Sequence, residues 1–253
     1  LDTTNAFALY VEHEGELAGI PADALQVARE AAEADGKTGW KFTLHMPSYL
    51  PVMQYGENRG LREQMYYAYV TRASEFGKAE LDNTGLITQI LRLRREAAQS
   101  LGFSSYSEES LTTKMAETPQ QVLDFLNELG QRAKPYAERD LAELRQFARE
   151  ELALTQLEAW DIAYASEKLR VKRYAFSDQE VKQYFPEDAV IAGMFNVVQK
   201  IYGLTLRASS APAWHDAVRF FDVCDADGKL IGQFYMDLYA RNSKRGGAWM
   251  DDA

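Results

Sequence analysis

The sequence is poor in cysteine, since Cys224 is the only one among 253 residues. A single thiol cannot form an intrachain disulfide, and it leaves no cysteine cluster for a metal ion. This usage fits a reducing compartment. Cys224 itself falls in an expected strand with no histidine nearby, so a buried small hydrophobe is favoured over a nucleophile.

Long apolar runs are also missing. No run reaches the roughly 18 residues that a membrane span needs. Residues 1–16 contain no basic side chain and four acidic ones, so they do not resemble a signal peptide. The chain begins at Leu1 and stops at Ala253 without an obvious terminating element, so we expect both ends to be cuts in a longer protein.

Positive charge is scarce as well. Lys and Arg number 28 against 38 Asp and Glu, which gives a formal net charge of -10. Phosphate binding needs a basic surface, so we expect no nucleic-acid partner. The local cluster of Arg92, Arg94 and Arg95 has no continuation and is expected to be a solvated helix face. Hydrophobic residues at 46% and charged residues at 26% are typical of a globular protein.

Helical periodicity dominates the rest of the sequence. Thr118 and Gln121 form a capping box with Pro119 at the first helical position. The apolar pattern continues from there past Pro135, where we expect a kink or a break into two helices. Helices are expected at residues 1–17, 22–35, 48–55, 58–74, 85–101, 107–115, 119–148, 157–173, 178–184 and 186–202.

Several of these helices carry apolar or aromatic stripes. Tyr66, Tyr67 and Tyr69 could form a ligand cage, but aromatic residues at helical spacing are more often part of a core. The helix at 85–101 has a stripe that begins at Leu86 and Ile87. The residues of helix 186–202 that are expected to face inward are Val190, Ile191, Met194, Phe195, Val198 and Ile201.

Two stretches alternate with the period of two that is typical of strands. The first is a short strand at residues 39–46. The second is a hairpin within residues 214–249, in which the strand at 218–224 and the return at 229–239 flank a turn at Asp225–Gly228. Residues 208–213 are expected to be a linker. The expected fold class is therefore mainly α, with a small antiparallel hairpin near the C-terminal end, in a single domain.

The residues complete no catalytic or metal-binding motif. His13 and Glu14 could begin the zinc motif H-E-x-x-H, but Leu17 stands where the second histidine is required. In a calcium-loop register around Gly228, the first and last positions are Val223 and Phe234, which cannot bind calcium. P-loop and G-x-G-x-x-G patterns are absent, and the three histidines are far apart in sequence. We therefore assign no catalytic residue and no metal ligand.

The segment after the hairpin is the only candidate for binding. Gly246 and Gly247 would let another backbone approach closely, and the neighbouring cations Lys244 and Arg245 could meet a carboxylate. A flexible surface loop with solvated charges is the alternative, and these residues alone favour it.

Several passages together resemble the thimet oligopeptidase-like M3 family of zinc metallopeptidases, and within it the oligopeptidase A branch. The resemblance extends over essentially the whole chain. Its passages are FGKAELDN at 76–83, LRLRREAAQSLGF at 91–103, LTTKMA at 111–116, WDIAY at 160–164, SEKL at 166–169, YAFSDQEVKQYFP at 174–186, GQFYMDLYAR at 232–241 and KRGGAWMDD at 244–252.

The resemblance implies a multi-helical, neurolysin-like scaffold with a deep channel that admits short peptides. It implies a cytoplasmic zinc endopeptidase that degrades short peptides, including signal-peptide remnants. The family holds zinc with H-E-x-x-H and a downstream glutamate, but this sequence contains no such motif. No family residue that binds zinc or acts in catalysis can therefore be carried over.

We accordingly expect zinc in the full-length parent and none in this chain, which should be inactive alone as a central fragment. The hairpin would form one wall of the cleft. Apolar faces exposed by the cut could drive self-association. The alternative is a short protein that keeps the scaffold as a non-catalytic peptide-binding or interaction module. The substrate-contact candidates are Tyr239, Arg241, Lys244, Arg245, Gly246 and Gly247.

Overall fold

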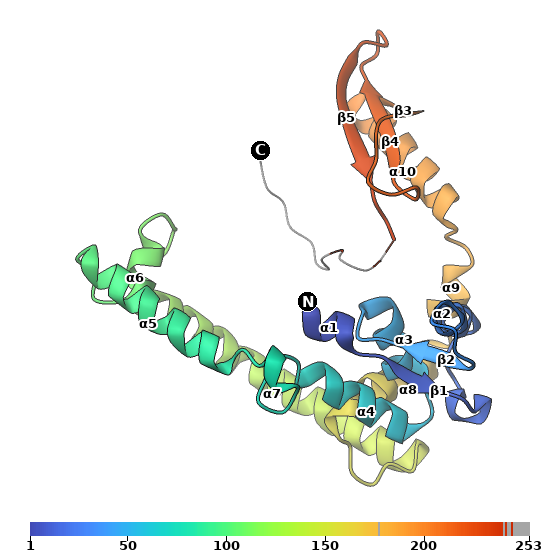
Figure 1. Ribbon diagram of the computed structural model, residues 1–253, viewed down its shortest axis with the longest axis horizontal. Helices are drawn as coiled ribbons and strands as arrows, with labels where there is room; N and C mark the ends of the chain where they lie inside the picture. Colours follow the sequence, from blue (N-terminus) through green and yellow to red (C-terminus); the bar gives the residue numbers. More distant parts are fainter. Residues whose placement is uncertain (177, 240, 242–243, 245–253) are drawn as a thin grey trace. The chain divides into compact units, whose positions relative to one another are not determined.

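The computed structural model describes residues 1–176, 178–239, 241 and 244. The chain divides into two compact units, Leu1–Leu169 and Arg170–Ala253. Helices predominate, and the strands form small antiparallel sheets (Figure 1). The mainly α fold class is thus confirmed, whereas a single domain stays a prediction.

The expected helix at residues 1–17 is wrong. Helix α1 (Asp2–Ala6) is followed by strand β1 (Leu9–Val11) and by the 3-10 helix η1 (Glu14–Leu17). Strand β1 pairs antiparallel with β2 (Trp40–Phe42). This pairing joins segments far apart in the sequence and satisfies the backbone groups on one edge of β1, which local periodicity could not reveal.

Three helices enclose the first core together with this small sheet: α2 (Ala22–Ala34), α3 (Met46–Tyr55) and α4 (Arg59–Val70). The expected strand at 39–46 is shorter than predicted, because it ends at Phe42 and Met46 begins α3. The buried residues of this core are Val11, Leu17, Ile20, Ala28, Trp40, Phe42, Leu44, Tyr49, Val52, Met53, Leu61 and Met65.

Two of the three tyrosines of α4 pack against this core. The ring of Tyr69 stacks on Tyr49 with centroids 4.4 Å apart, and Tyr66 packs against Trp160 at 6.1 Å. Tyr67 is 56% exposed. Core packing is therefore confirmed for Tyr66 and Tyr69 but not for Tyr67.

A buried carboxylate joins α4 to the end of this unit. Asp161 is fully buried and accepts hydrogen bonds from Arg59 Nη2 at 2.7 Å and from Arg62 Nη2 at 2.8 Å. Arg62 is 1% exposed, donates to the carbonyl of Gly56 and lies over the ring of Tyr164. Burial by itself raises the pKa of Asp161, but the hydrogen bonds from the two guanidinium groups outweigh it and lower that pKa.

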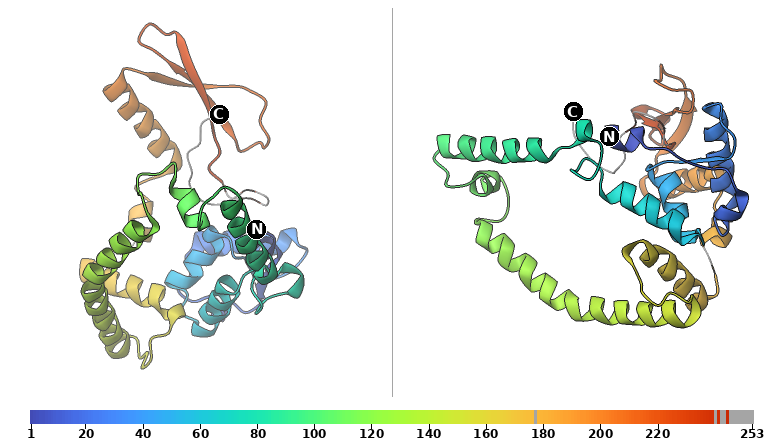
Figure 2. Two further views of the ribbon diagram at one scale, coloured as in Figure 1. Left: turned by 90° about the vertical axis from the view of Figure 1, so that its left-hand side faces the viewer. Right: turned by 60° about the horizontal axis from the view of Figure 1, so that its bottom comes forward.

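The long helix α7 (Pro119–Glu151) begins as expected, because the Thr118 hydroxyl accepts a hydrogen bond from the Gln121 N–H at 3.1 Å. The helix continues through Pro135 and curves along its length (Figure 2), so the expected alternative of a break is wrong. Near its C-terminal end, buried Leu144 and Ala148 belong to a second core with Ala165.

The remaining elements of this part are η2 (Ala79–Leu81), α5 (Thr84–Ser100), α6 (Tyr106–Leu111), η3 (Ala159–Asp161) and α8 (Ile162–Tyr174).

The apolar stripes of α5 and α7 are present but largely uncovered. Ala98 is the only buried residue of α5, and α7 buries only Leu144, Phe147 and Ala148. Such faces are unusually large for the surface of a folded protein. The exposed apolar residues are Leu86, Ile87, Ile90, Leu91 and Leu93 on α5, and Leu123, Phe125, Leu126, Leu129 and Tyr136 on α7.

The second unit is a three-stranded antiparallel sheet with helix α10 (Glu187–Tyr202) against one face (Figure 1). Phe221 is 2% exposed, stacks on Phe234 and meets Phe195 of α10 edge-on at 5.1 Å. Strand β3 lies partly in the expected linker. The other elements are α9 (Asp178–Lys182), β3 (Thr205–Ser209), β4 (Arg219–Cys224) and β5 (Leu230–Met236), with strand order β3-β4-β5.

The inward face expected for α10 is confirmed only in part. Ile191 is buried and Phe195 packs on the sheet, but Val190, Met194 and Ile201 are exposed. One helix on one sheet face covers a single stripe, so side chains beside that stripe remain in solvent.

The hairpin turn and the burial of Cys224 are confirmed. The Asp225 carboxylate accepts hydrogen bonds from the backbone N–H groups of Asp227 and Lys229, at 3.0 and 2.9 Å. Gly228 has φ of +80°, a backbone conformation that favours glycine. Asp225 therefore stabilises the turn itself, as expected for a hairpin rather than a calcium loop.

Candidate functional site

The segment that follows β5 is organised around one carboxylate. Asp237 accepts two hydrogen bonds from Arg241, at 2.7 and 2.5 Å, and one from Trp214 Nε1 at 3.1 Å. The ammonium of Lys244 lies 3.1 Å from the same carboxylate. The hydrogen bonds from Arg241, followed by those from Trp214 and Lys244, hold the pKa of Asp237 well below its usual range, although partial desolvation opposes them.

Lys244 also binds the backbone of this segment. Its ammonium donates to the carbonyl oxygens of Asp237 at 2.6 Å and Tyr239 at 3.0 Å. An ammonium has three donors, and these contacts with the Asp237 carboxylate account for all of them. Lys244 therefore binds the backbone of Asp237 and Tyr239 as well as the Asp237 carboxylate.

Tyr239 is tied to the start of α10. Its hydroxyl donates to the carboxylate of Glu187, and this bond raises the pKa of Tyr239. Arg219 of β4 lies 3.6 Å from Glu187 and 3.4 Å from Asp188. The hydroxyl and the two carboxylates thus connect the exit of the sheet to α10.

Three of the six predicted contact residues, Tyr239, Arg241 and Lys244, can be placed, and all three have partners within the chain. Arg245, Gly246 and Gly247 lie outside the described residues. Sequence reasoning missed Asp237, which binds both described cations. Asp237 stands inside the GQFYMDLYAR passage, but nothing in that passage names its partners.

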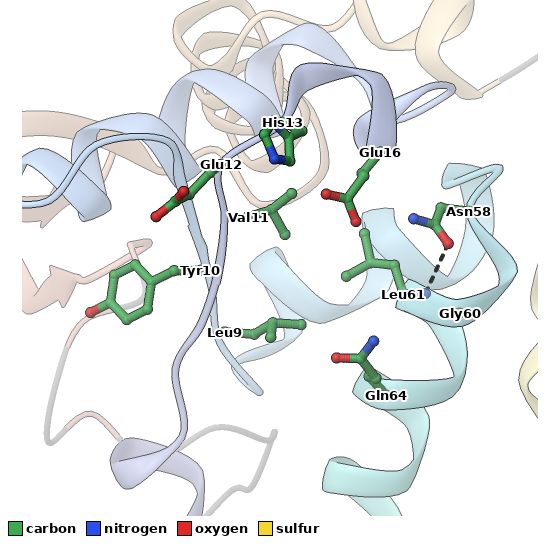
Figure 3. A pocket seen from close by; sticks show the side chains of 10 residues that line it. All are labelled: Leu9, Tyr10, Val11, Glu12, His13, Glu16, Asn58, Gly60, Leu61 and Gln64. Atoms are coloured by element: carbon green, nitrogen blue, oxygen red, sulfur yellow. Dashed lines mark hydrogen bonds between the residues drawn. The ribbon is translucent and has the colours of Figure 1, made fainter.

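A cavity of about 340 Å³ lies between β1 and the first turns of α4 (Figure 3). The side chains of Leu9 and Val11 point into it, while those of Tyr10 and Glu12 point to the other side of the strand. Because residues 1–17 were expected to be helical, the sequence offered no signal for this cavity.

The rim of this cavity is polar and carries negative charge. The carboxylate of Glu16 points over it, and Gln64 of α4 faces it from below (Figure 3). The side-chain oxygen of Asn58 accepts from the Leu61 N–H at 3.2 Å, so it caps α4. Among the lining residues only His13 can carry positive charge.

Neither site supplies a set of metal ligands. Among the residues that the structure describes, no three or more His, Cys, Asp or Glu side chains gather in a way that could hold a metal ion. These residues do not fit a zinc ion, and we derive no catalytic step from them. Over the same residues, no helix is both long enough and apolar enough to cross a bilayer.

Known proteins resemble this chain over its full length. The sequence pattern of Peptidase family M3 matches residues 52–253. The chain belongs to peptidase family M3. Oligopeptidase A of Haemophilus influenzae and that of Escherichia coli are each 51% identical over 255 residues, which cover 100% of this chain. Dipeptidyl carboxypeptidase of Salmonella typhimurium is 31% identical over 253 residues, which cover 99% of it.

This M3 chain spans only part of the length of its relatives. The aligned residues cover 37% of the Haemophilus oligopeptidase A and 38% of the Escherichia coli protein. The M3 match begins inside α3 and includes all of β3, β4 and β5, whereas β1, η1 and β2 precede it. The resemblance drawn from the sequence passages is confirmed.

Proposed function

We propose that this chain forms part of a metallo-oligopeptidase that hydrolyses short peptides. The 51% identity to oligopeptidase A along the complete chain carries the proposal. Zinc as the metal, signal-peptide remnants among the substrates and a cytoplasmic location belong to the same proposal and rest on the family resemblance. The 253 residues contain no H-E-x-x-H motif, so this chain alone should be inactive.

The residues after β5 are proposed to contact the peptide. Arg241 and Lys244 are paired with Asp237, so a substrate carboxylate would have to share these cations with it. A peptide that shares Lys244 would gain a charge-assisted hydrogen bond. Arg245, Gly246 and Gly247, outside the described residues, complete the proposed contact set.

A chimera tests this function directly. The aligned segment of Escherichia coli oligopeptidase A is replaced by this chain, and cleavage of a quenched fluorescent peptide is measured. We expect chelator-sensitive cleavage by the chimera and none by the 253-residue chain with added zinc. Cleavage by the chain alone would contradict its proposed inactivity, whereas peptide binding without turnover by a folded chimera would favour a non-catalytic peptide-binding module.

The same chimera tests the contact residues. Lys244→Met should raise KM about fivefold while kcat changes little, because a binding contact is lost. Lys229→Met is the matched control, since Lys229 is an exposed lysine of the hairpin turn. Equal KM values for the two variants would show that Lys244 does not contact the substrate.

Self-association through α5 and α7 is part of the proposal for the isolated chain. In the longer relatives, residues outside the aligned segment are available to cover these faces, whereas the isolated chain has only a second copy of itself. Light scattering should show a mass that rises with concentration, and Ile90→Lys with Leu129→Lys should suppress the rise. Gln89→Lys adds charge beside the apolar stripe of α5 and should not. A monomer at high concentration would contradict the proposal.

A further inference from the structure

Strand β1 has one edge without a partner strand in the described part of the chain, because its sheet contains only β1 and β2. A Cβ atom added to Gly39 would lie 2.3 Å from the carbonyl oxygen of Val11, so that carbonyl faces the β2 side. Successive residues of an antiparallel strand direct their backbone groups to opposite edges. The N–H and C=O groups of Tyr10 are therefore directed to the open edge.

This open edge borders the cavity between β1 and α4. Leu9 and Val11 point into the cavity from β1, and Leu61 approaches from α4 (Figure 3). A volume of about 340 Å³ lies at the low end of the range of small-ligand sites, about 300–1,000 Å³. The cavity thus offers an apolar floor directly beside free backbone donors and acceptors.

Charge sets the kind of side chain that this cavity would accept. Glu16 is exposed at the rim and makes no ion pair among the described residues. Gln64 adds a neutral amide on the opposite side. A long side chain with a cationic end would place its methylene groups on Leu9 and Leu61 and its charge beside Glu16.

We propose that the open edge of β1 binds a short extended peptide that carries lysine or arginine. The peptide adds to the sheet as a third strand and hydrogen-bonds the backbone of Tyr10. Its alternate side chains fall on the face of Leu9 and Val11, so one basic side chain enters the cavity beside Glu16. The site uses none of the residues proposed to contact substrate after β5, and it stands or falls independently of peptidase function.

Fluorescence anisotropy with the full 253-residue chain tests the proposal. The probe is a labelled, end-blocked octapeptide of alternating threonine and lysine. We expect it to bind at least about tenfold more tightly than the matched threonine–glutamate peptide. A version N-methylated at every residue should bind more weakly, because it has no backbone N–H group left to pair with a strand edge.

Variants separate this site from general attraction to an acidic protein. Glu16→Gln should weaken binding about three- to fivefold, and Gln64→Lys by more, because it adds repulsion at the rim. Glu14→Gln removes the same charge two residues away from the cavity and should leave the affinity unchanged. Circular dichroism of each variant establishes that it is folded.

Three outcomes would overturn the proposal. The first is no binding of the threonine–lysine peptide at about millimolar concentration, the weak limit of specific recognition. The second is equal binding of the N-methylated peptide or equal effects of Glu16→Gln and Glu14→Gln. The third is a dimer that Gln64→Lys dissociates and the peptide does not, which would assign the edge to a second copy of the chain.

Discussion

Replacing Asp161 by alanine should lower the free energy of unfolding by about 3–5 kcal/mol, the cost of leaving a buried charge without its partner. Arg62 is 1% exposed, and without Asp161 its buried guanidinium would keep only carbonyl partners and the ring of Tyr164. Arg59 is partly exposed and can turn to solvent. Urea unfolding followed by circular dichroism measures the loss.

The matched control is Asp140→Ala. Asp140 pairs with Arg139 at 3.3 Å, but its side chain is 69% exposed. An exposed pair of this kind contributes little, so the change should stay within about 0.5 kcal/mol. A loss for Asp161→Ala no larger than that of Asp140→Ala would show that the buried pair does not stabilise this unit.

The same pair predicts how stability depends on pH. The folded-state pKa of Asp161 is lowered below its unfolded-state value. Its stabilisation is therefore fully present above the unfolded pKa of about 3.9 and is lost as the pH falls through the folded-state pKa. Asp161→Asn has no titrating carboxyl. The difference in the free energy of unfolding between this variant and the unmodified chain should therefore be large at neutral pH and should decrease as the pH falls below about 4.

Replacing Gly39 by alanine should destabilise the chain by about 2–4 kcal/mol, because backbone strain and a steric clash act together. Gly39 has φ of +84°, which a residue with a side chain adopts only at a cost. The new Cβ would also lie 2.3 Å from the Val11 carbonyl oxygen and 3.2 Å from Glu12 Cα, both backbone atoms that cannot rotate away. Strand β1 would have to shift away from β2.

Alanine substitutions at two other glycines distinguish the cost of backbone strain from the cost of the steric clash. Gly36 has φ of +67° with nothing within 4 Å of an added Cβ, so Gly36→Ala should cost only the strain, about 1–2 kcal/mol. Gly15 has neither feature, and Gly15→Ala should change stability by less than about 0.5 kcal/mol. Thermal unfolding of the three variants ranks their losses of stability. Equal losses for Gly39→Ala and Gly36→Ala would show that the close approach of β1 is not rigid.

The proposed contact residues show where sequence reasoning reached its limit. The motif passages pointed to Tyr239, Arg241 and Lys244, and the sequence placed them at the end of an expected strand and just beyond it. The bond from Trp214 to Asp237 joins residues 23 positions apart, and the one from Tyr239 to Glu187 joins residues 52 positions apart. Local patterns do not encode such pairs. Substrate contact by these residues stays a prediction.

The sequence by itself determined the helices and the turn whose signals are local. The Thr118 cap and the Asp225 turn were each visible within a few residues, because caps and turns depend on neighbours along the chain. Family membership was likewise contained in short passages.

Tertiary structure alone decided the features that depend on distant partners. Residues 9–11 form a strand because they pair with β2, which lies about 30 residues further along the chain. Asp161 is buried because it pairs with Arg62, 99 positions earlier, whose charge neutralises that of the carboxylate. The stripe of α5 predicted burial but remains mostly in solvent. A sequence pattern specifies which face of an element is apolar, whereas the other elements of the fold decide whether anything covers it.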